Sequence, residues 1–170
     1  SYRLYFSDKQ RGKILRLSMD GITPISDYGM NTWFKENLKT SDSILGSYDD
    51  NKDEYNVTIK NETGSHTVSY SEDVKGWVSF KTFYPESGVS LSNEYYTYNN
   101  GVPFIHHQKG TVNQPVDYNT FYNIYKESEV EVILNDGPSV VKSFNTLSYE
   151  GSQSKIDKFV DELYAEPWYP

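Results

Sequence analysis

Residues 94–106 read Glu-Tyr-Tyr-Thr-Tyr-Asn-Asn-Gly-Val-Pro-Phe-Ile-His. Two stretches rich in aromatic and β-branched side chains flank an Asn-Asn-Gly turn at positions 99–101. Asn-Gly is the strongest short hairpin signal, because the tight turns that match strand twist need positive φ angles, which these residues tolerate. The stretch therefore predicts an antiparallel hairpin that pairs residues 94–98 with residues 102–106.

The same pattern of short strands separated by polar turns recurs along the chain. Residues 2–6 are expected to pair with 13–17, and residues 44–48 with 55–60. Further strands are predicted at residues 66–70, 77–83, 121–125, 129–132 and 139–149. These spacings predict a mainly β fold, an antiparallel meander of hairpins with a propeller-like or sandwich architecture.

Two short helices are expected beside the strands. Residues 26–38 carry apolar side chains three to four positions apart, with Ser26 or Asp27 as the N-cap. The same spacing over residues 154–163 predicts a helix near the C-terminus. Neither is long, so each would depend on packing against a sheet.

The length of 170 residues suits a single mainly β domain over residues 1–170. Because the chain opens without Met inside a predicted strand, a fragment of a much longer chain is the other interpretation. Aromatic residues make up 16% of the sequence, with 16 tyrosines. Disordered segments lack such residues, so a folded chain is expected.

Charge and composition exclude several classes of partner and chemistry. The formal net charge of −8 disfavours binding to nucleic acid, and no apolar run approaches the ~20 residues that cross a bilayer. We therefore expect neither nucleic acid nor membrane as a partner. The chain has no cysteine, which excludes disulfides, thiolate nucleophiles and cysteine-ligated metals.

No catalytic constellation emerges from the sequence. The histidines are His66, His106 and His107; the adjacent two would point to opposite faces of a strand and could not share a metal. Surface or structural roles are favoured for all three. No nucleophile elbow, phosphate loop or dinucleotide fingerprint is present. The predictions are no enzyme activity, no catalytic residue and no cofactor.

One acidic turn resembles part of a calcium loop. Asp49, Asn51 and Asp53 supply oxygens at its first, third and fifth positions. The sixth position should be Gly and is Glu54, and the twelfth should be Glu and is Lys60. A hairpin turn rich in Asp and Asn has the same appearance without a metal. We favour the plain turn, so no metal site is predicted beyond this calcium candidate.

Exposed aromatic residues are the expected contact surface, although the tryptophans as a group favour the core. Three tyrosines of the quoted hairpin straddle both faces of the sheet, so at least one should be exposed. The binding or interface candidates are Tyr95, Tyr96, Tyr98 and Trp168. Aromatic platforms beside polar loops also suit sugar rings, which keeps a carbohydrate- or host-surface-binding module as the alternative function.

A long run of residues resembles a known family. Residues 8–26, Asp-Lys-Gln-Arg-Gly-Lys-Ile-Leu-Arg-Leu-Ser-Met-Asp-Gly-Ile-Thr-Pro-Ile-Ser, are similar to a segment of large virion structural proteins of tailed phages. The likeness continues in order over about the whole chain, and its specificity lies in the ordered set. Further pieces are residues 28–30, 33–34, 46–50, 54–56, 76–81, 93–96, 133–136, 142–144 and 149–151.

That family includes proteins of crAss-like phages and marine myoviruses. The resemblance implies a long polypeptide in the distal, stabilising or muzzle-like part of the tail, with a propeller-like or related β architecture and no catalytic residues. We therefore predict a non-enzymatic structural protein of the virion tail, made in the cytoplasm of the bacterial host. It would assist tail assembly or stabilisation through contacts with other virion proteins and with copies of itself.

Overall fold

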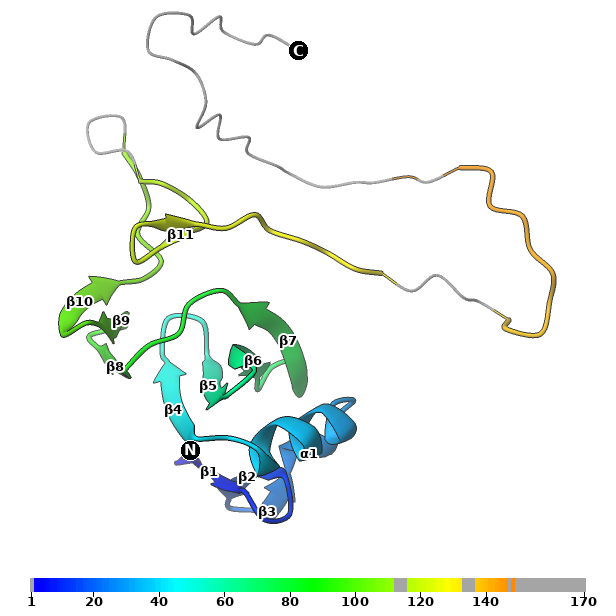
Figure 1. Cartoon of the computed structure of the whole chain (residues 1–170), viewed down its shortest axis with the longest axis horizontal. Helices are drawn as coiled ribbons and strands as arrows, with labels where there is room; N and C mark the ends of the chain where they lie inside the picture. The colour runs from blue at the N-terminus through cyan, green and yellow to red at the C-terminus, as the bar shows by residue number, and fades with distance from the viewer. Residues whose placement is uncertain (1, 112–115, 133–136, 147, 149–170) are drawn as a thin grey trace, which may run out of the picture.

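The computed structural model describes residues 2–111, 116–132, 137–146 and 148. In these residues short strands form antiparallel sheets, joined by one α-helix and one 3-10 turn (Figure 1). The sheets follow one another along the chain as meanders, and none closes into a barrel. The predicted mainly β, antiparallel fold is confirmed.

The first sheet has the order β1-β2-β3, with β1 at Leu4–Asp8, β2 at Lys13–Ser18 and β3 at Gly21–Pro24. Leu4 of β1 lies opposite Leu17 of β2, which confirms the first predicted hairpin. Strand β3 was not predicted, because four residues that end on proline give too short an alternation to recognise.

The predicted helix begins later than expected. A 3-10 turn, η1, spans Ile25–Asp27, and the α-helix α1 spans Asn31–Lys39 with Met30 at the N-cap position. Neither Ser26 nor Asp27 caps it, so the predicted start was wrong. Gly29 has a φ of +79°, a left-handed conformation that interrupts a right-handed helix, so α1 can start only after it.

The second sheet is central and has the order β4-β5-β6-β7. Its strands are β4 (Ser43–Asp49), β5 (Glu54–Asn61), β6 (Gly64–Ser71) and β7 (Gly76–Lys81). These strands confirm the predicted hairpin and the strands predicted at residues 66–70 and 77–83, the second of which ends at Lys81. Along β5, side chains alternate between an apolar face and a polar face.

The apolar face of the second sheet packs against the first sheet and α1, and this layer is the hydrophobic core (Figure 1). Phe34 of α1 is fully buried and contacts Trp77 of β7, with ring centroids 4.6 Å apart. Trp33 and Trp77 both pack against this core. The buried members are Ile14, Ile25, Phe34, Leu38, Tyr55, Val57, Ile59, Val68 and Tyr70.

The third sheet has the order β10-β9-β8, with β8 at Ser87–Leu91, β9 at Glu94–Asn99 and β10 at Val102–Ile105. Asn100 and Gly101 have φ angles of +51° and +72°, so the hairpin quoted first is confirmed with its predicted turn. Strand β8 was missed, because the proline before it and the Ser-Gly pair at its start were interpreted as a loop.

After the third sheet the predicted strands are corrected. Residues 121–125 form two strands, β11 (Thr120–Phe121) and β12 (Ile124–Tyr125), because Tyr122 and Asn123 between them have positive φ. Residues 126–132 and 137–146, here named the C-terminal arm, form no strand.

The strands predicted at 129–132 and 139–149 are therefore wrong for the described residues of those ranges. A strand is defined by hydrogen bonds to a neighbour, and the described arm has no neighbouring strand. Figure 1 shows its yellow and orange parts running away from the sheets. The helix predicted at residues 154–163 and the candidate Trp168 lie outside the described residues.

Candidate functional site

The second face of the central sheet is buried although it is polar. Its side chains are mostly hydroxyl and amide groups, and they face the third sheet. The buried members are Ser47, Asp49, Asn56, Thr58, Thr67 and Ser69. Buried polar groups are costly unless they are hydrogen-bonded, so this layer depends on internal pairing.

Hydrogen bonds within this layer satisfy the buried groups and connect the two sheets. Ser69 Oγ donates to Asn56 Oδ1 at 2.5 Å, within the central sheet. Ser47 Oγ and Tyr95 Oη share a hydrogen bond of 2.7 Å that links β4 to β9. Tyr95 is only 1% exposed, and burial raises its pKa to about 12, so its hydroxyl remains protonated.

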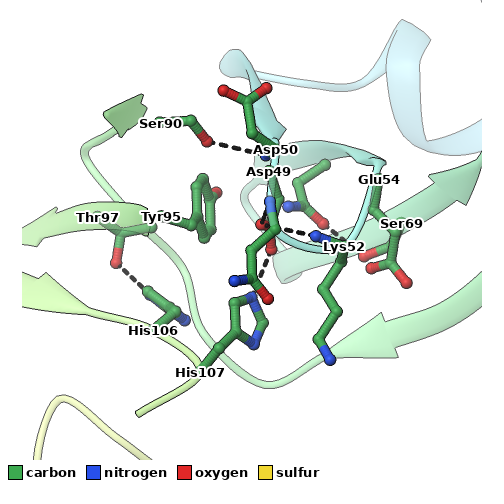
Figure 2. Close-up of polar contacts among 12 residues, drawn as sticks. Asp49, Asp50, Lys52, Glu54, Ser69, Ser90, Tyr95, Thr97, His106 and His107 are labelled. Atoms are coloured by element: carbon green, nitrogen blue, oxygen red, sulfur yellow. Dashed lines mark hydrogen bonds and ion pairs between the residues drawn. The ribbon is translucent and has the colours of Figure 1, made fainter. Parts of the chain in front are cut away.

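Asp49 organises the hairpin between β4 and β5. Its Oδ1 accepts the backbone N–H groups of Asn51 at 3.0 Å and Lys52 at 3.3 Å, which is the hydrogen-bonding of an Asx turn. Its Oδ2 lies 2.5 Å from His107 Nε2 (Figure 2). Asp49 is only 2% exposed, so from inside the protein it joins the central sheet to the segment that directly follows β10.

The adjacent histidines face the same buried polar layer, contrary to the sequence prediction. Strand β10 ends at Ile105, and His107 has a φ of +59°, so strand alternation does not apply to the pair. Their ring centroids are 6.0 Å apart. His106 Nε2 lies 2.7 Å from Thr97 Oγ1, and burial lowers the pKa of His106 to about 4. His106 is therefore neutral at pH 7.

The three calcium candidates make separate hydrogen bonds in the same hairpin. Asp49 accepts the bonds already described, Asn51 Nδ2 donates to the carbonyl of Asn93 at 3.1 Å, and Asp53 accepts from the hydroxyl of Tyr48. Within residues 2–111, 116–132, 137–146 and 148, no three His, Asp or Glu side chains form a group that could hold a metal. This arrangement is that of a hydrogen-bonded turn.

A cavity of about 520 Å³ opens beside the histidines. Aromatic rings line it together with lysine, aspartate and amide groups. The aromatic members are Phe83, Tyr95, Phe104, Tyr118, Phe121 and Tyr122, and the charged members are Asp49, Lys52, Lys81, Lys109 and Asp117. Its volume is in the usual range for a small-ligand pocket. The sequence indicated Tyr95 and Asp49 individually, but gave no sign that they meet the histidines here.

The other interface candidates lie elsewhere. Tyr96 and Tyr98 are half-buried residues of β9, and the hydroxyl of Tyr96 donates to Glu94 at 2.5 Å. They do not line the cavity. Their partly exposed rings keep them available as contact residues, whereas Tyr95 belongs to the interior.

The C-terminal arm carries several strongly exposed apolar side chains. Val130 is 85% exposed and Val141 is 99% exposed, and Val132, Val140 and Phe144 are also exposed. Exposed apolar side chains that come together in one surface are candidates for an interaction site. Sequence reasoning missed this surface because the same alternation was assigned to strands inside the fold.

No helix in the described parts of the chain has the length and apolar character needed to cross a membrane.

Comparisons with known proteins identify the family. The family model described as Crassvirus muzzle protein matches residues 2–101, which is more than half of the chain. A second model, described as Crassvirus muzzle protein C-terminal domain, matches residues 116–166. No curated protein and no solved structure gives a match. The chain therefore belongs to the Crassvirus muzzle protein family and is a muzzle-type structural protein of a crAss-like phage virion, as the resemblance predicted.

Proposed function

We propose that this protein assists tail assembly or stabilisation by binding other virion proteins and further copies of itself, and that it catalyses no reaction. The observation that supports this most directly is the exposed apolar arm. Burying a valine or phenylalanine side chain is favourable by about 1.5–3 kcal/mol relative to leaving it in water. Several such side chains on one extended segment favour association with a partner surface.

The polar cluster beside the cavity supports a non-catalytic role. A histidine that transfers protons in catalysis works best with a pKa near the working pH. His106 is neutral, buried and bonded to Thr97, and His107 is bonded to Asp49, which also organises a turn. We assign these residues to holding the third sheet on the central sheet.

Replacing the arm's exposed apolar residues by serine tests the proposal. The variant Val130→Ser, Val132→Ser, Val140→Ser, Val141→Ser and Phe144→Ser should fold, because these side chains are exposed and outside the core. We expect phage that encode only this variant to form virions that contain little of the protein, as measured by mass spectrometry. Immunogold labelling of the protein on the phage tails should fall accordingly.

The matched control is Met19→Ser with Val74→Ser, which changes exposed apolar residues away from the arm. It should be incorporated like the unaltered protein. Incorporation of the arm variant at the normal level, with circular dichroism unchanged, would contradict the assembly proposal.

The cavity favours a second candidate function, the binding of a carbohydrate. Sugar rings stack on aromatic side chains while their hydroxyl groups bond to charged and amide groups, and the cavity lining offers both. Lys52 is exposed at the tip of the β4–β5 hairpin and lines the cavity, so its ammonium is accessible to a sugar hydroxyl.

A glycan array tests this candidate. We expect a defined set of glycans to bind, and Lys52→Ala to weaken that binding about tenfold or more, since a hydrogen bond to a charged group contributes about 1.5–3 kcal/mol. Lys39→Ala, at the exposed end of α1 and outside the cavity, should bind normally. An array with no bound glycan would rule the candidate out.

A further inference from the structure

We propose that residues 128–132 of the C-terminal arm add as a strand to the outer edge of β7 in a second copy of the chain. The inference rests on the proposed assembly function and names the surface that performs it. It requires a segment able to form a strand, a free sheet edge to receive it, and a reason for the two to meet.

The donor segment reads Ser-Glu-Val-Glu-Val. Val130 and Val132 would share one face of a strand, and Glu129 and Glu131 the other. Both valines are exposed, at 85% and 65%, and valine favours strands because its β-branched side chain packs well on a pleated sheet. The segment therefore has strand chemistry but no strand partner in the described part of its own chain.

The acceptor is the outer edge of β7. In the order β4-β5-β6-β7, one edge of β7 bonds to β6, and no described strand bonds to the other. Unpaired strand edges expose backbone N–H and C=O groups that readily accept an added strand. Val78 and Phe80 of β7 are exposed as well, so an added strand would also cover apolar side chains.

The remaining outer strands are poorer acceptors. β3 and β10 have four residues each and contain Pro24 and Pro103, whose nitrogen cannot donate a ladder hydrogen bond. β4 already lies against β8 and β1. β1 has five residues against six in β7. Among the described strands, β7 offers the longest edge free of these obstacles.

Charge favours the same pairing. The donor carries Glu127, Glu129 and Glu131, and a chain of net charge −8 would repel such a segment over most of its surface. Lys75 directly precedes β7 in the chain, and Lys81, the last residue of β7, already pairs with Glu54 of β5 at 3.2 Å, so Lys75 is the cation at this strand that a donor carboxylate can approach. A second copy is the occupant because the arm runs away from the sheets of its own chain (Figure 1).

Disulfide trapping tests the contact, and the cysteine-free sequence makes it specific. One chain carries Val130→Cys or Val132→Cys, and a second chain with a different tag carries Val78→Cys. A disulfide forms only when the two Cβ atoms approach within about 3.5–4.5 Å. We expect mixed, oxidised samples to give a disulfide-linked heterodimer with at least one of the two arm positions.

Val141→Cys is the matched control, since it is 99% exposed on the same arm but outside the donor segment. It should give little heterodimer with Val78→Cys. Equal trapping from position 141, or no trapping from positions 130 and 132, would overturn the proposal.

Proline substitution separates strand donation from assembly in general. Val130→Pro prevents strand pairing at an exposed position, so light scattering of the full chain should show loss of self-association, while Val141→Pro should associate like the unaltered protein. Unchanged self-association of Val130→Pro, or a monomeric unaltered chain, would refute strand donation. The proposed assembly function would still hold if virions incorporated the Val130→Pro protein normally but excluded the protein with the five serine substitutions in the arm.

Discussion

Replacing Glu72 by alanine is expected to destabilise the fold by about 1.5–3 kcal/mol, because it removes the buried carboxylate to which the partly buried Arg16 and the hydroxyl of Tyr5 are bonded. Glu72 follows β6, and its side chain is only 4% exposed. Its Oε2 lies 2.6 Å from Arg16 Nη1 of β2 and 3.6 Å from Arg3 Nε, and its Oε1 accepts from the hydroxyl of Tyr5 in β1. The carboxylate thus joins the first sheet to the central sheet.

Such a loss is a large part of the 5–15 kcal/mol that stabilises a typical domain. Urea unfolding followed by tryptophan fluorescence should therefore show a much lower midpoint for Glu72→Ala. Arg11→Ala is the control, because the Arg11–Asp8 ion pair is exposed, and its midpoint should match that of the unaltered protein. If the urea midpoint of Glu72→Ala were unchanged as well, the hydrogen bonds and ion pairs of Glu72 would add no net stability.

Lowering the pH from 7.5 to 5 is expected to cost about 2 kcal/mol of stability through His106. Burial, followed by repulsion from His107, lowers its pKa to about 4 in the folded protein, against about 6.5 in an unfolded chain. Between these values the unfolded state binds more protons. The stabilising contribution is therefore complete above pH 6.5 and is lost as the pH falls toward 4.

His106→Gln isolates this effect, since glutamine can still bond to Thr97 and does not titrate. Urea unfolding at several pH values should show a smaller loss between pH 7.5 and 5 for the variant than for the unaltered protein. The groups that face His106, namely Asp49, His107 and Lys81, are retained in both proteins. Equal losses in the two proteins would show that His106 does not govern the acid response.

The strands that sequence reasoning located share one property: each has a clear run of aromatic or β-branched residues beside a turn that the sequence makes recognisable. The turn at Asn100 and Gly101 is the clearest case, since the residue types required by its φ angles are written in the sequence. The strands that were missed or wrongly assigned lack such local support. β3 and β8 give short or interrupted signals, and residues 129–132 alternate like a strand without a partner strand in the described chain.

The candidate site shows the same limit more strongly. Asp49 and His107 are 58 positions apart, and Ser47 and Tyr95 are 48 apart, yet each pair is hydrogen-bonded. Asp49 appeared as a calcium candidate because its neighbours carry oxygens. Its hydrogen bond to His107 depends on how the third sheet packs on the central one, and nothing near Asp49 in the sequence encodes that contact.

The sequence by itself determined the antiparallel strand class, the positions of most hairpins and the family of virion proteins. These depend on side-chain alternation and turn residues, which act over a few neighbouring positions. Only the tertiary structure decided which polar residues are buried together, that adjacent histidines face one cluster, and that an alternating segment remains outside the sheets. Those outcomes depend on packing between distant segments, where burial and hydrogen bonding are settled jointly by the whole fold.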